Sequence, residues 1–371
     1  MAFDCPDLLD AVTAWSSAHL AIHYPNFQDI SLQLQGRALS GLSASIKGNS
    51  LSREMCVAVA MVMCSMSSIS DATGGTWLHH LSGAAAALQG NRSQQNRLSQ
   101  KRREGQGGPL SFLQSFEGKW LLRNFAYHDV LMSVSLDRRP LLTGDYWMSA
   151  DDALADPYFA FASRILFFIS EISVLKADWA EEQECHFGQG SVSALSPDQA
   201  WGNTHSVLVE RSLVLGQNLR DWTCPDTVSP ESPLTLLSEA YRSAALICLS
   251  RTLRKYAPEE VDEAVPEGVQ HHVASICEIA ENIPEGALAE CTFLFPLFIA
   301  GGEADHVDHI AVVKSRLSTM NRWRKFRNVE ACKEVLEEVW RRRSEGAMGK
   351  DAEKVDWLDI AQYRGWQLAL T

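Results

Sequence analysis

Apolar residues recur at steps of three and four along most of the chain, and this helical period constrains the fold more than any other feature. Within residues 237–248, 332–340 and 158–179, the apolar side chains fall on one side of an α-helix. Each such stripe must be covered by another element. The stripes consist of Leu237, Ala240, Tyr241, Ala244, Ala245 and Cys248; Cys332, Val335, Leu336, Val339 and Trp340; and Ala162, Ile165, Leu166, Ile169, Ile172 and Leu175.

Two further helices are predicted from their first residues. Pro6 suits the first position of a helix, so a helix is expected to start there. Its expected inward-facing residues are Leu8, Leu9, Val12, Trp15 and Leu20. Ser196 supplies a capping hydroxyl, Pro197 a first-turn proline and Asp198 an acid near the positive end of the helix dipole. From there a long helix is predicted to run to about Trp222.

The pattern as a whole predicts an all-α fold. Alternating runs bounded by Asn-Gly or Asp-Gly turns are lacking, so no significant sheet is expected. No fixed-period repeat is present, which favours irregular stacked helix pairs over a regular solenoid. We therefore predict one large irregular helical domain over residues 1–371. Residues 90–108 interrupt it, because Asn, Gln, Ser, Gly and basic residues replace the apolar period there, and they are predicted to form a disordered loop.

The charge balance argues against direct contact with nucleic acid. Lys and Arg number 33 against 46 Asp and Glu, which gives a net charge of −13. Nucleic-acid affinity depends largely on cations that displace condensed counterions, so this chain is not expected to bind nucleic acid directly. Its one basic cluster, in the predicted loop, is Lys101, Arg102 and Arg103. Such a cluster is typical of a nuclear import signal or of a solvated loop, and both interpretations stay open.

Cysteine usage and hydropathy predict an intracellular chain. The nine cysteines are an odd number, and no two are separated by only two residues as in a zinc knuckle or a redox pair. They are expected to be reduced thiols. The N-terminal sequence does not predict a secretory signal. The longest apolar stretch, residues 55–66, is expected to be too short for a bilayer, which needs about 20 residues.

No arrangement of reactive side chains predicts an enzyme. A Gly-x-Ser-x-Gly elbow, a Walker loop and a dinucleotide fingerprint are lacking. The densest group of metal-ligand residue types lies in residues 303–309, where His306 and His309 are three apart. These residues are interpreted as a solvated first helical turn rather than a metal site. We expect no catalytic residues, no metal site and no cofactor.

Two segments combine large apolar residues with small ones. Residues 77–84 read Trp-Leu-His-His-Leu-Ser-Gly-Ala. Trp77 and Leu81, four apart, are expected to share a buried face, while Gly83 and Ala84 are small enough for a neighbouring helix to approach.

The second segment, residues 293–304, reads Phe-Leu-Phe-Pro-Leu-Phe-Ile-Ala-Gly-Gly-Glu-Ala. Pro296 is expected to break or kink a helix, and Gly301 with Gly302 to stop it before Glu303 opens the next one.

The residues, order and spacing of these segments resemble the regulatory domain of fungal-specific transcription factors. The matching residues are Trp77, His80, Leu81, Gly83 and Ala84, then Pro296, Leu297, Gly301, Glu303 and Ala304, and finally Trp340. Residues 125–131, 239–242 and 322–323 are also similar, so the resemblance spans residues 8–366. It implies an all-helical domain that modulates activation, dimerisation and sometimes effector response, with no catalytic residues.

In that family a six-cysteine zinc cluster precedes this domain and contacts DNA. Only Cys5 lies near the start of these 371 residues, so zinc and DNA binding are expected only through a missing cluster or a partner. A fragment of a longer protein and a natural stand-alone regulatory domain both stay open. We expect a nuclear transcriptional regulator whose partners are proteins, either a second copy or a zinc-cluster factor, with no membrane partner.

The alternative is a stand-alone, non-catalytic binding or scaffolding protein, or a ligand sensor, which a cytoplasmic location would favour. A small-molecule effector would require a cavity between helices. The candidate lining residues are Trp147, Trp179, Trp201 and Trp222.

Overall fold

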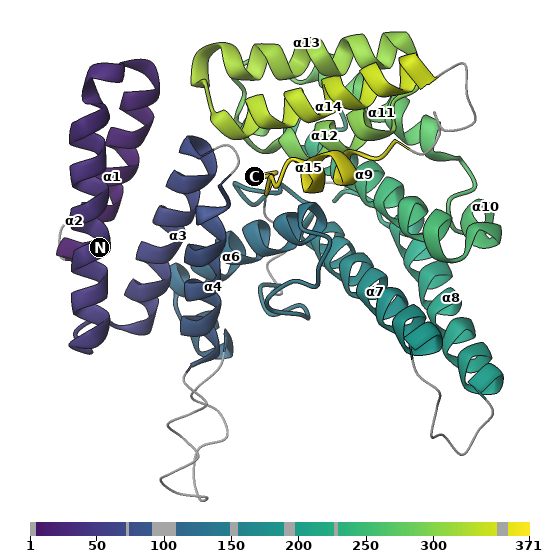
Figure 1. The fold of residues 1–371 in the computed structure, drawn as a ribbon, viewed down its shortest axis with the longest axis horizontal. Coiled ribbons are helices and arrows are strands. Elements are labelled where there is room, and N and C mark those ends of the chain that lie inside the picture. The colour runs from purple at the N-terminus through teal and green to yellow at the C-terminus, as the bar shows by residue number, and fades with distance from the viewer. Residues whose placement is uncertain are drawn as a thin grey trace, which may run out of the picture.

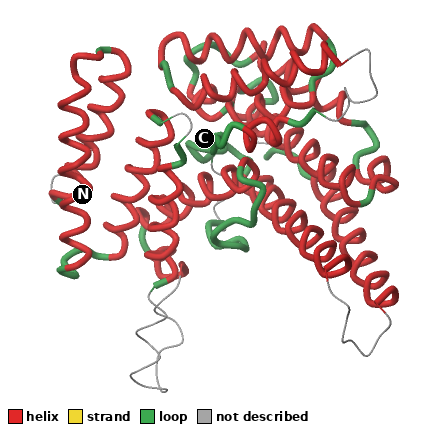
Figure 2. Tube along the Cα trace, viewed as in Figure 1, coloured by secondary structure: helices red, strands yellow, loops and turns green. Residues whose placement is uncertain are grey.

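The computed structural model describes residues 5–71, 74–90, 109–148, 155–188, 197–225, 229–346 and 355–371. Throughout these ranges the regular structure is helical, with short 3₁₀ turns and no strand (Figure 2). The nearest approach to a sheet is a single bridge between Asp156 and Ala160. The predicted all-α fold is therefore confirmed. The basic residues Lys101, Arg102 and Arg103, and all but the first residue of the predicted loop, lie outside the described ranges.

The N-terminal part consists of two helical hairpins. Helices α1 (Pro6–His23) and α2 (Gln28–Lys47) form the first, and α3 (Arg53–Ser70) and α4 (Thr76–Gln89) form the second. The α1–α2 hairpin stands at one edge of the molecule and reaches the rest mainly through contacts between α1 and α3 (Figure 1). Ser52 caps α3, because its side-chain oxygen accepts the Met55 N–H.

The middle of the chain forms long helices that pack in sequence. These are α6 (Phe116–Ser135), α7 (Ser163–Gly188), α8 (Pro197–Asp221) and α9 (Pro233–Tyr256), and α7 contacts the other three. The predicted start of α8 at Pro197 is confirmed. Helix α7 begins at Ser163, not at residue 158 as predicted, because residues 156–160 form a turn: Asp156 and Ala160 exchange two backbone hydrogen bonds.

The C-terminal part encloses one short, fully buried helix. Its elements are α10 (Val261–Ala264), α11 (Val269–Asn282), α12 (Leu294–Glu303), α13 (Val307–Arg324), α14 (Arg327–Gly346) and α15 (Trp357–Tyr363). Every residue of α12 is buried, and it contacts α9, α11, α13 and α14. Residues 366–371 follow α15 without regular structure, and Leu368 and Leu370 are buried.

The predicted inward face of α1 is wrong in part. Leu8 is buried as predicted and Trp15 is half-buried, but Leu9, Val12 and Leu20 are each 38–39% exposed. The other buried residues of this helix are Ala11, Ala14, Ala18 and Ala21. Small side chains face the neighbouring helices because α1 packs closely against both α2 and α3.

Helix α3 corrects the expectation drawn from hydropathy. It has 18 residues and is apolar enough to meet a length and composition criterion for crossing a membrane, although the apolar stretch had been expected to be too short. Of this helix, 61% is buried inside the fold, and its residues pack against α1 and α4. Burial of this kind is typical of a core helix.

Candidate functional site

Helix α12 carries the second matched segment, and its bounds correct two predictions. Pro296 lies in the first turn, where a backbone N–H has no partner within the helix, so the proline is accommodated without breaking it. Gly301 and Gly302 continue the helix, which ends at Glu303. Pro296 and Leu297 are both buried.

The two glycines of α12 allow its neighbours to approach closely. A Cβ atom on Gly301 would lie 2.7 Å from Leu336 Cδ1 and 2.9 Å from Val313 Cγ1. One on Gly302 would lie 2.5 Å from Trp357 Cδ1. Because real Cβ atoms do not approach other atoms so closely, any larger residue would displace α13, α14 or Trp357.

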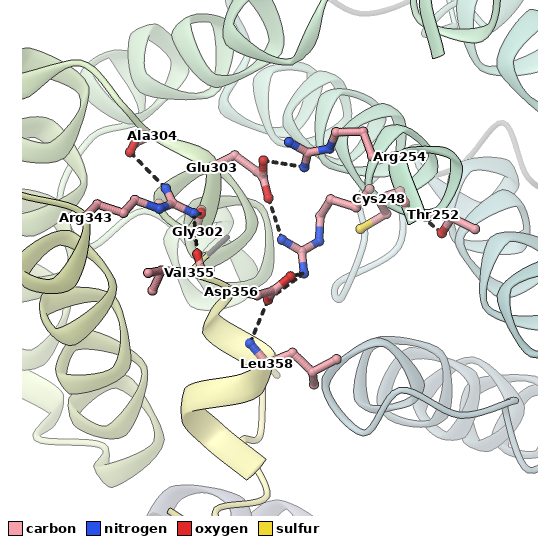
Figure 3. Close-up of polar contacts among 12 residues, drawn as sticks. Cys248, Thr252, Arg254, Gly302, Glu303, Ala304, Arg343, Val355, Asp356 and Leu358 are labelled. Carbon is pink, nitrogen blue, oxygen red and sulfur yellow. Dashed lines mark hydrogen bonds and ion pairs between the residues drawn. The ribbon is translucent and has the colours of Figure 1, made fainter. Parts of the chain in front are cut away.

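Glu303 is the buried acceptor of an ionic cluster in which Arg251 is also largely buried and Arg254 and Asp356 are partly exposed. The Glu303 side chain is 6% exposed and receives hydrogen bonds from Arg251 and from Arg254, the latter at 2.5 Å (Figure 3). Arg251 also donates to both carboxylate oxygens of Asp356, at 2.9 and 2.8 Å. The Arg251 guanidinium lies 5.1 Å from the centre of the Trp357 ring, within range of a cation–π contact.

The pKa shifts of Arg251 and Asp356 favour the ionised form of both side chains. Burial alone would lower the pKa of Arg251, but the carboxylates of Asp356 and Glu303 raise it above its ordinary value. Burial alone would raise the pKa of Asp356, but the Arg251 charge lowers it below its ordinary value. Arg251 and Asp356 therefore remain a charged pair near neutral pH and connect α9 to the start of α15.

Side chains also satisfy the last backbone carbonyls of α12. Trp340 Nε1 donates to the Gly301 oxygen at 2.9 Å, and Gln270 Nε2 donates to the Glu303 oxygen at 2.9 Å. Arg343 donates to the oxygens of Gly302 at 2.7 Å, Val355 at 3.0 Å and Ala304 at 3.4 Å (Figure 3). The final carbonyls of a helix have no partner within it, so these side-chain donors supply the missing hydrogen bonds at the end of α12. We call Arg251, Arg254, Glu303, Arg343 and Asp356 the Glu303 cluster.

The first matched segment lies on α4 and divides into buried and accessible residues. Trp77, Leu81 and Ala84 are fully buried, and Trp77 Nε1 donates to the Gln367 oxygen at 3.3 Å. His80 is half-buried and Gly83 is exposed. A Cβ atom on Gly83 would meet no atom within 4 Å, so the predicted approach of a neighbouring helix at this glycine is wrong.

His80 and Gly83 line an open groove of about 550 Å³ between the end of α2, α3 and α4. Other lining residues are Leu42, Ile46, Leu51, His79 and Ala87. Burial, and after it the neighbouring His79, lower the pKa of His80, so its imidazole is neutral near pH 7. We call the open groove lined by these residues the α2–α4 groove. Its walls are mainly apolar, and their composition suits a protein surface better than a polar substrate.

Metal-ligand residue types do not converge in the part of the chain that the structure describes. There, no group of three or more His, Cys, Asp and Glu side chains is placed to hold an ion. His306 and Asp308 are 61% and 82% exposed, and the His306 ring accepts the Asp308 N–H at 3.4 Å as the cap of α13. Glu303 is committed to its arginines.

The predicted tryptophan lining of an effector cavity is not found. Trp147 and Trp179 are buried in the core, where Trp179 stacks on Tyr256 with ring centres 5.8 Å apart. Trp222 packs against the core from a half-buried position. The Trp201 side chain lies outside the described part of the structure.

Sequence reasoning missed the arginines of the Glu303 cluster. The signal that could have found them is the position of Arg251 and Arg254 three residues apart, just beyond the apolar stripe that ends at Cys248. Buried arginine requires an acidic partner. The partners are remote in sequence, however, and only the fold brings Glu303 and Asp356 to them.

Comparisons with known proteins identify the family. The family model described as the fungal specific transcription factor domain matches residues 1–371. Comparison with curated proteins and with solved structures gives no match. The matched family is a transcription-factor domain and not an enzyme family. The match covers the whole sequence, including α4, α12 and all residues of the Glu303 cluster, and the chain therefore belongs to the family of the fungal specific transcription factor domain.

Proposed function

We propose that this chain regulates transcription in the nucleus by binding protein partners, and that one partner is a second copy of itself. Family membership supports the role in transcription. The net charge of −13 argues that contact with DNA is made by another segment or another protein. The proposal includes no catalytic step.

The observation that carries this proposal is the apolar surface of the α1–α2 hairpin. Leu32, Leu39 and Ile46 on α2 are 54%, 45% and 58% exposed. They are seven residues apart, so they form one stripe along the helix, as in the seam of a coiled coil. We call these three residues the α2 stripe. Ile46 also lines the α2–α4 groove, so the stripe continues into it.

The inner side of the hairpin explains why the large side chains face outward. Alanines fill the buried face of α1, and Ala38 is buried on α2. A Cβ atom on Gly41 would lie 2.8 Å from Asp7 Oδ1, so the two helices are already close together. Small residues inside and large apolar residues outside leave an exposed apolar surface, which in a folded protein favours association.

A second copy of the chain is a suitable partner for this surface. Helix α2 carries only Asp29, Arg37 and Lys47 as charged residues, and Arg37 is paired with Asp10 at 2.6 Å. Two α2 stripes can therefore meet about a two-fold axis without placing like charges together. Two hairpins packed in this way would form a four-helix bundle, which is a common geometry for helical dimers.

Sedimentation velocity tests the proposed surface. We expect the wild-type chain to sediment as a dimer whose fraction falls on dilution. The double variant Leu32→Glu/Leu39→Glu should be monomeric, because two charges would be buried at the interface. Val207 and Val214 on α8 provide the control, since they are also seven apart and each 53% exposed. Val207→Glu/Val214→Glu should leave the dimer intact. A wild-type chain that is monomeric at every concentration would overturn the self-association.

A further inference from the structure

A second cavity lies where the N-terminal and C-terminal helices meet. It measures about 210 Å³ and is separate from the α2–α4 groove. Its lining residues come from α1, α3 and α6 on one side and from α12, α13 and α14 on the other. The 3₁₀ turn η5 (Leu288–Thr292) also contributes to it. A molecule bound here would contact elements that are remote in sequence.

Aromatic and apolar side chains form much of the wall. The rings of Tyr127 and Tyr158 stack with their centres 5.3 Å apart. Trp15 and Phe326 add two further rings, and Met320 adds a flexible thioether. Flat apolar surfaces of this kind suit an aromatic ligand, because rings pack well face to face or edge to face. An apolar cavity of about 150 Å³ is large enough for benzene, so this one admits a fused or substituted ring.

Several lining residues have a buried side-chain atom without a protein partner, among them His128, Thr292 and Asn328. In these three residues the atoms are His128 Nδ1, Thr292 Oγ1 and Asn328 Oδ1, on side chains that are 5%, 7% and 2% exposed. Each is a hydrogen-bonding group in a site where leaving it unpaired costs about 1–3 kcal/mol. Such groups in one cavity indicate that the occupant is itself able to form hydrogen bonds.

The other bonds of these residues fix their positions. The Asn328 amide nitrogen donates to the oxygens of Ala369 at 3.2 Å and Thr371 at 2.8 Å, which assigns its remaining oxygen as the free acceptor. The Thr292 carbonyl accepts the Tyr241 hydroxyl at 2.9 Å, while Thr292 Oγ1 has no partner. His128 Nε2 lies 3.4 Å from Ser65 Oγ, while Nδ1 has no partner.

The charges around the cavity favour an uncharged occupant. Among the lining side chains Arg324 is the one Arg, Lys, Asp or Glu, and it lies 3.6 Å from Glu290, which also pairs with Arg316 at 3.0 Å. Burial lowers the pKa of His128 to about 4, so the ring is neutral near pH 7. A ligand carboxylate or ammonium would therefore lose its hydration in this cavity without gaining a free opposite charge, and its binding would be unfavourable.

We propose that this cavity is a binding site for a small, uncharged aromatic molecule that carries a hydroxyl or amide group. The ring packs among Tyr127, Tyr158 and Phe326, and the polar group bonds Thr292, Asn328 or His128. Occupancy joins α1 and α3 to α13 and α14, so it stabilises the contact between the two parts of the chain. This site does not depend on self-association, and either can fail without the other.

The first test is calorimetric titration of the full chain with 2-naphthol, an uncharged fused ring with one hydroxyl. We expect saturable binding at one site and a higher thermal unfolding temperature. The matched probe 2-naphthoate has the same rings and a carboxylate, and it should bind at least about tenfold more weakly because its charge must be buried. Equal or tighter binding of 2-naphthoate would overturn the proposed ligand class, and no binding of 2-naphthol would overturn the site.

Variants locate the probe. Thr292→Val keeps the shape and removes the free hydroxyl, so 2-naphthol should bind about tenfold more weakly. Phe326→Leu is a second lining variant, useful if Thr292→Val does not fold, and it should also weaken binding because it removes one of the rings that pack against the probe. Thr252→Val is the control, because this buried hydroxyl already donates to the Cys248 oxygen and lies outside the cavity. Binding that neither lining variant changes would place 2-naphthol elsewhere and contradict the proposal.

Discussion

Glycines 83 and 301 belong to the two matched segments, and both lie inside helices, yet their surroundings are opposite. Gly301 faces Leu336 and Val313 at distances too short for a Cβ atom, whereas Gly83 faces open space. The sequence alone does not distinguish these two glycines. The space around each glycine decides what it contributes.

Alanine substitution should therefore have opposite effects at these two positions. Gly301→Ala should lower the free energy of unfolding by about 1–3 kcal/mol, because the added methyl group overpacks the core. Gly83→Ala should raise it by up to about 1 kcal/mol, because alanine favours the helix and nothing obstructs it. Urea denaturation of both variants measures the difference. A stabilising Gly301→Ala would show that α12 is not packed as described.

His272 provides a pH-dependent test at the same scale. Burial, and after it the neighbouring His271, lower the pKa of His272 to about 4. The unfolded histidine takes up a proton near pH 6.5, so between these values the unfolded state binds more protons than the folded state. The contribution of His272 to stability is thus present above about pH 6.5, declines as the pH falls, and is lost below about 4.

Comparing the wild type with His272→Gln isolates this contribution, since glutamine does not titrate. Between pH 6.5 and 4 the wild type should lose up to about 3 kcal/mol more unfolding free energy than the variant. Parallel pH curves for the two proteins would contradict the buried, neutral state of His272.

At this scale the sequence predicted burial better than it predicted contacts. Trp77 and Leu81 are buried as expected, because their spacing of four residues places them on one helix face. Glu303 was matched by resemblance, but its role depends on a bond from Arg251, which lies 52 residues before it in the sequence. Arg251 also bonds Asp356, which lies 105 residues after Arg251. Contacts across such distances depend on tertiary packing and leave no local pattern.

Among the elements, helices α9 and α12 are joined by an ionic contact. Arg251 and Arg254 extend from α9 to Glu303 at the end of α12, and Arg251 continues to Asp356 before α15 (Figure 3). Residues of three elements thus meet at the Arg251 guanidinium. Removing one partner from a buried ion pair is costly, because the other charge remains in a poorly solvated place.

Glu303→Gln should lower the free energy of unfolding by about 3 kcal/mol. The control is Glu338→Gln on α14, because Glu338 likewise pairs with two arginines, Arg341 and Arg342, but on the exposed face of its helix. That variant should lose much less, since water screens its pairs. Thermal and urea unfolding of both proteins provide the comparison, and equal losses would contradict a special role for burial at Glu303.

Element bounds were predictable where the local chemistry is strong. Pro197 with its preceding serine marks the start of α8, but the apolar period alone placed the start of α7 too early. On α1 Leu8 was placed correctly, but Leu9 and Val12 were expected to be buried, whereas Ala11 and Ala14 occupy the buried positions. Large apolar side chains do not mark the buried face of a helix when close packing against its neighbours requires small residues there.

For the whole molecule, the segment after α15 connects helices from the N-terminal and C-terminal parts of the chain. Trp77 on α4 donates to the Gln367 oxygen, Ser135 on α6 donates to the Leu368 oxygen at 2.7 Å, and Asn328 on α14 donates to the Ala369 oxygen. N-terminal and C-terminal helices are therefore fixed to one buried strip of chain. The α1–α2 hairpin extends beyond this centre and leaves the α2 stripe exposed (Figure 1).

The most direct test of the central claim is a tethered transcription assay in fungal cells. The chain is fused to an unrelated DNA-binding domain, and transcription of a reporter with the matching site is measured. We predict that reporter output differs from that of the DNA-binding domain alone, and that Leu32→Glu/Leu39→Glu abolishes the difference while Val207→Glu/Val214→Glu preserves it. A folded, expressed fusion that leaves the reporter unchanged would contradict the role in transcription.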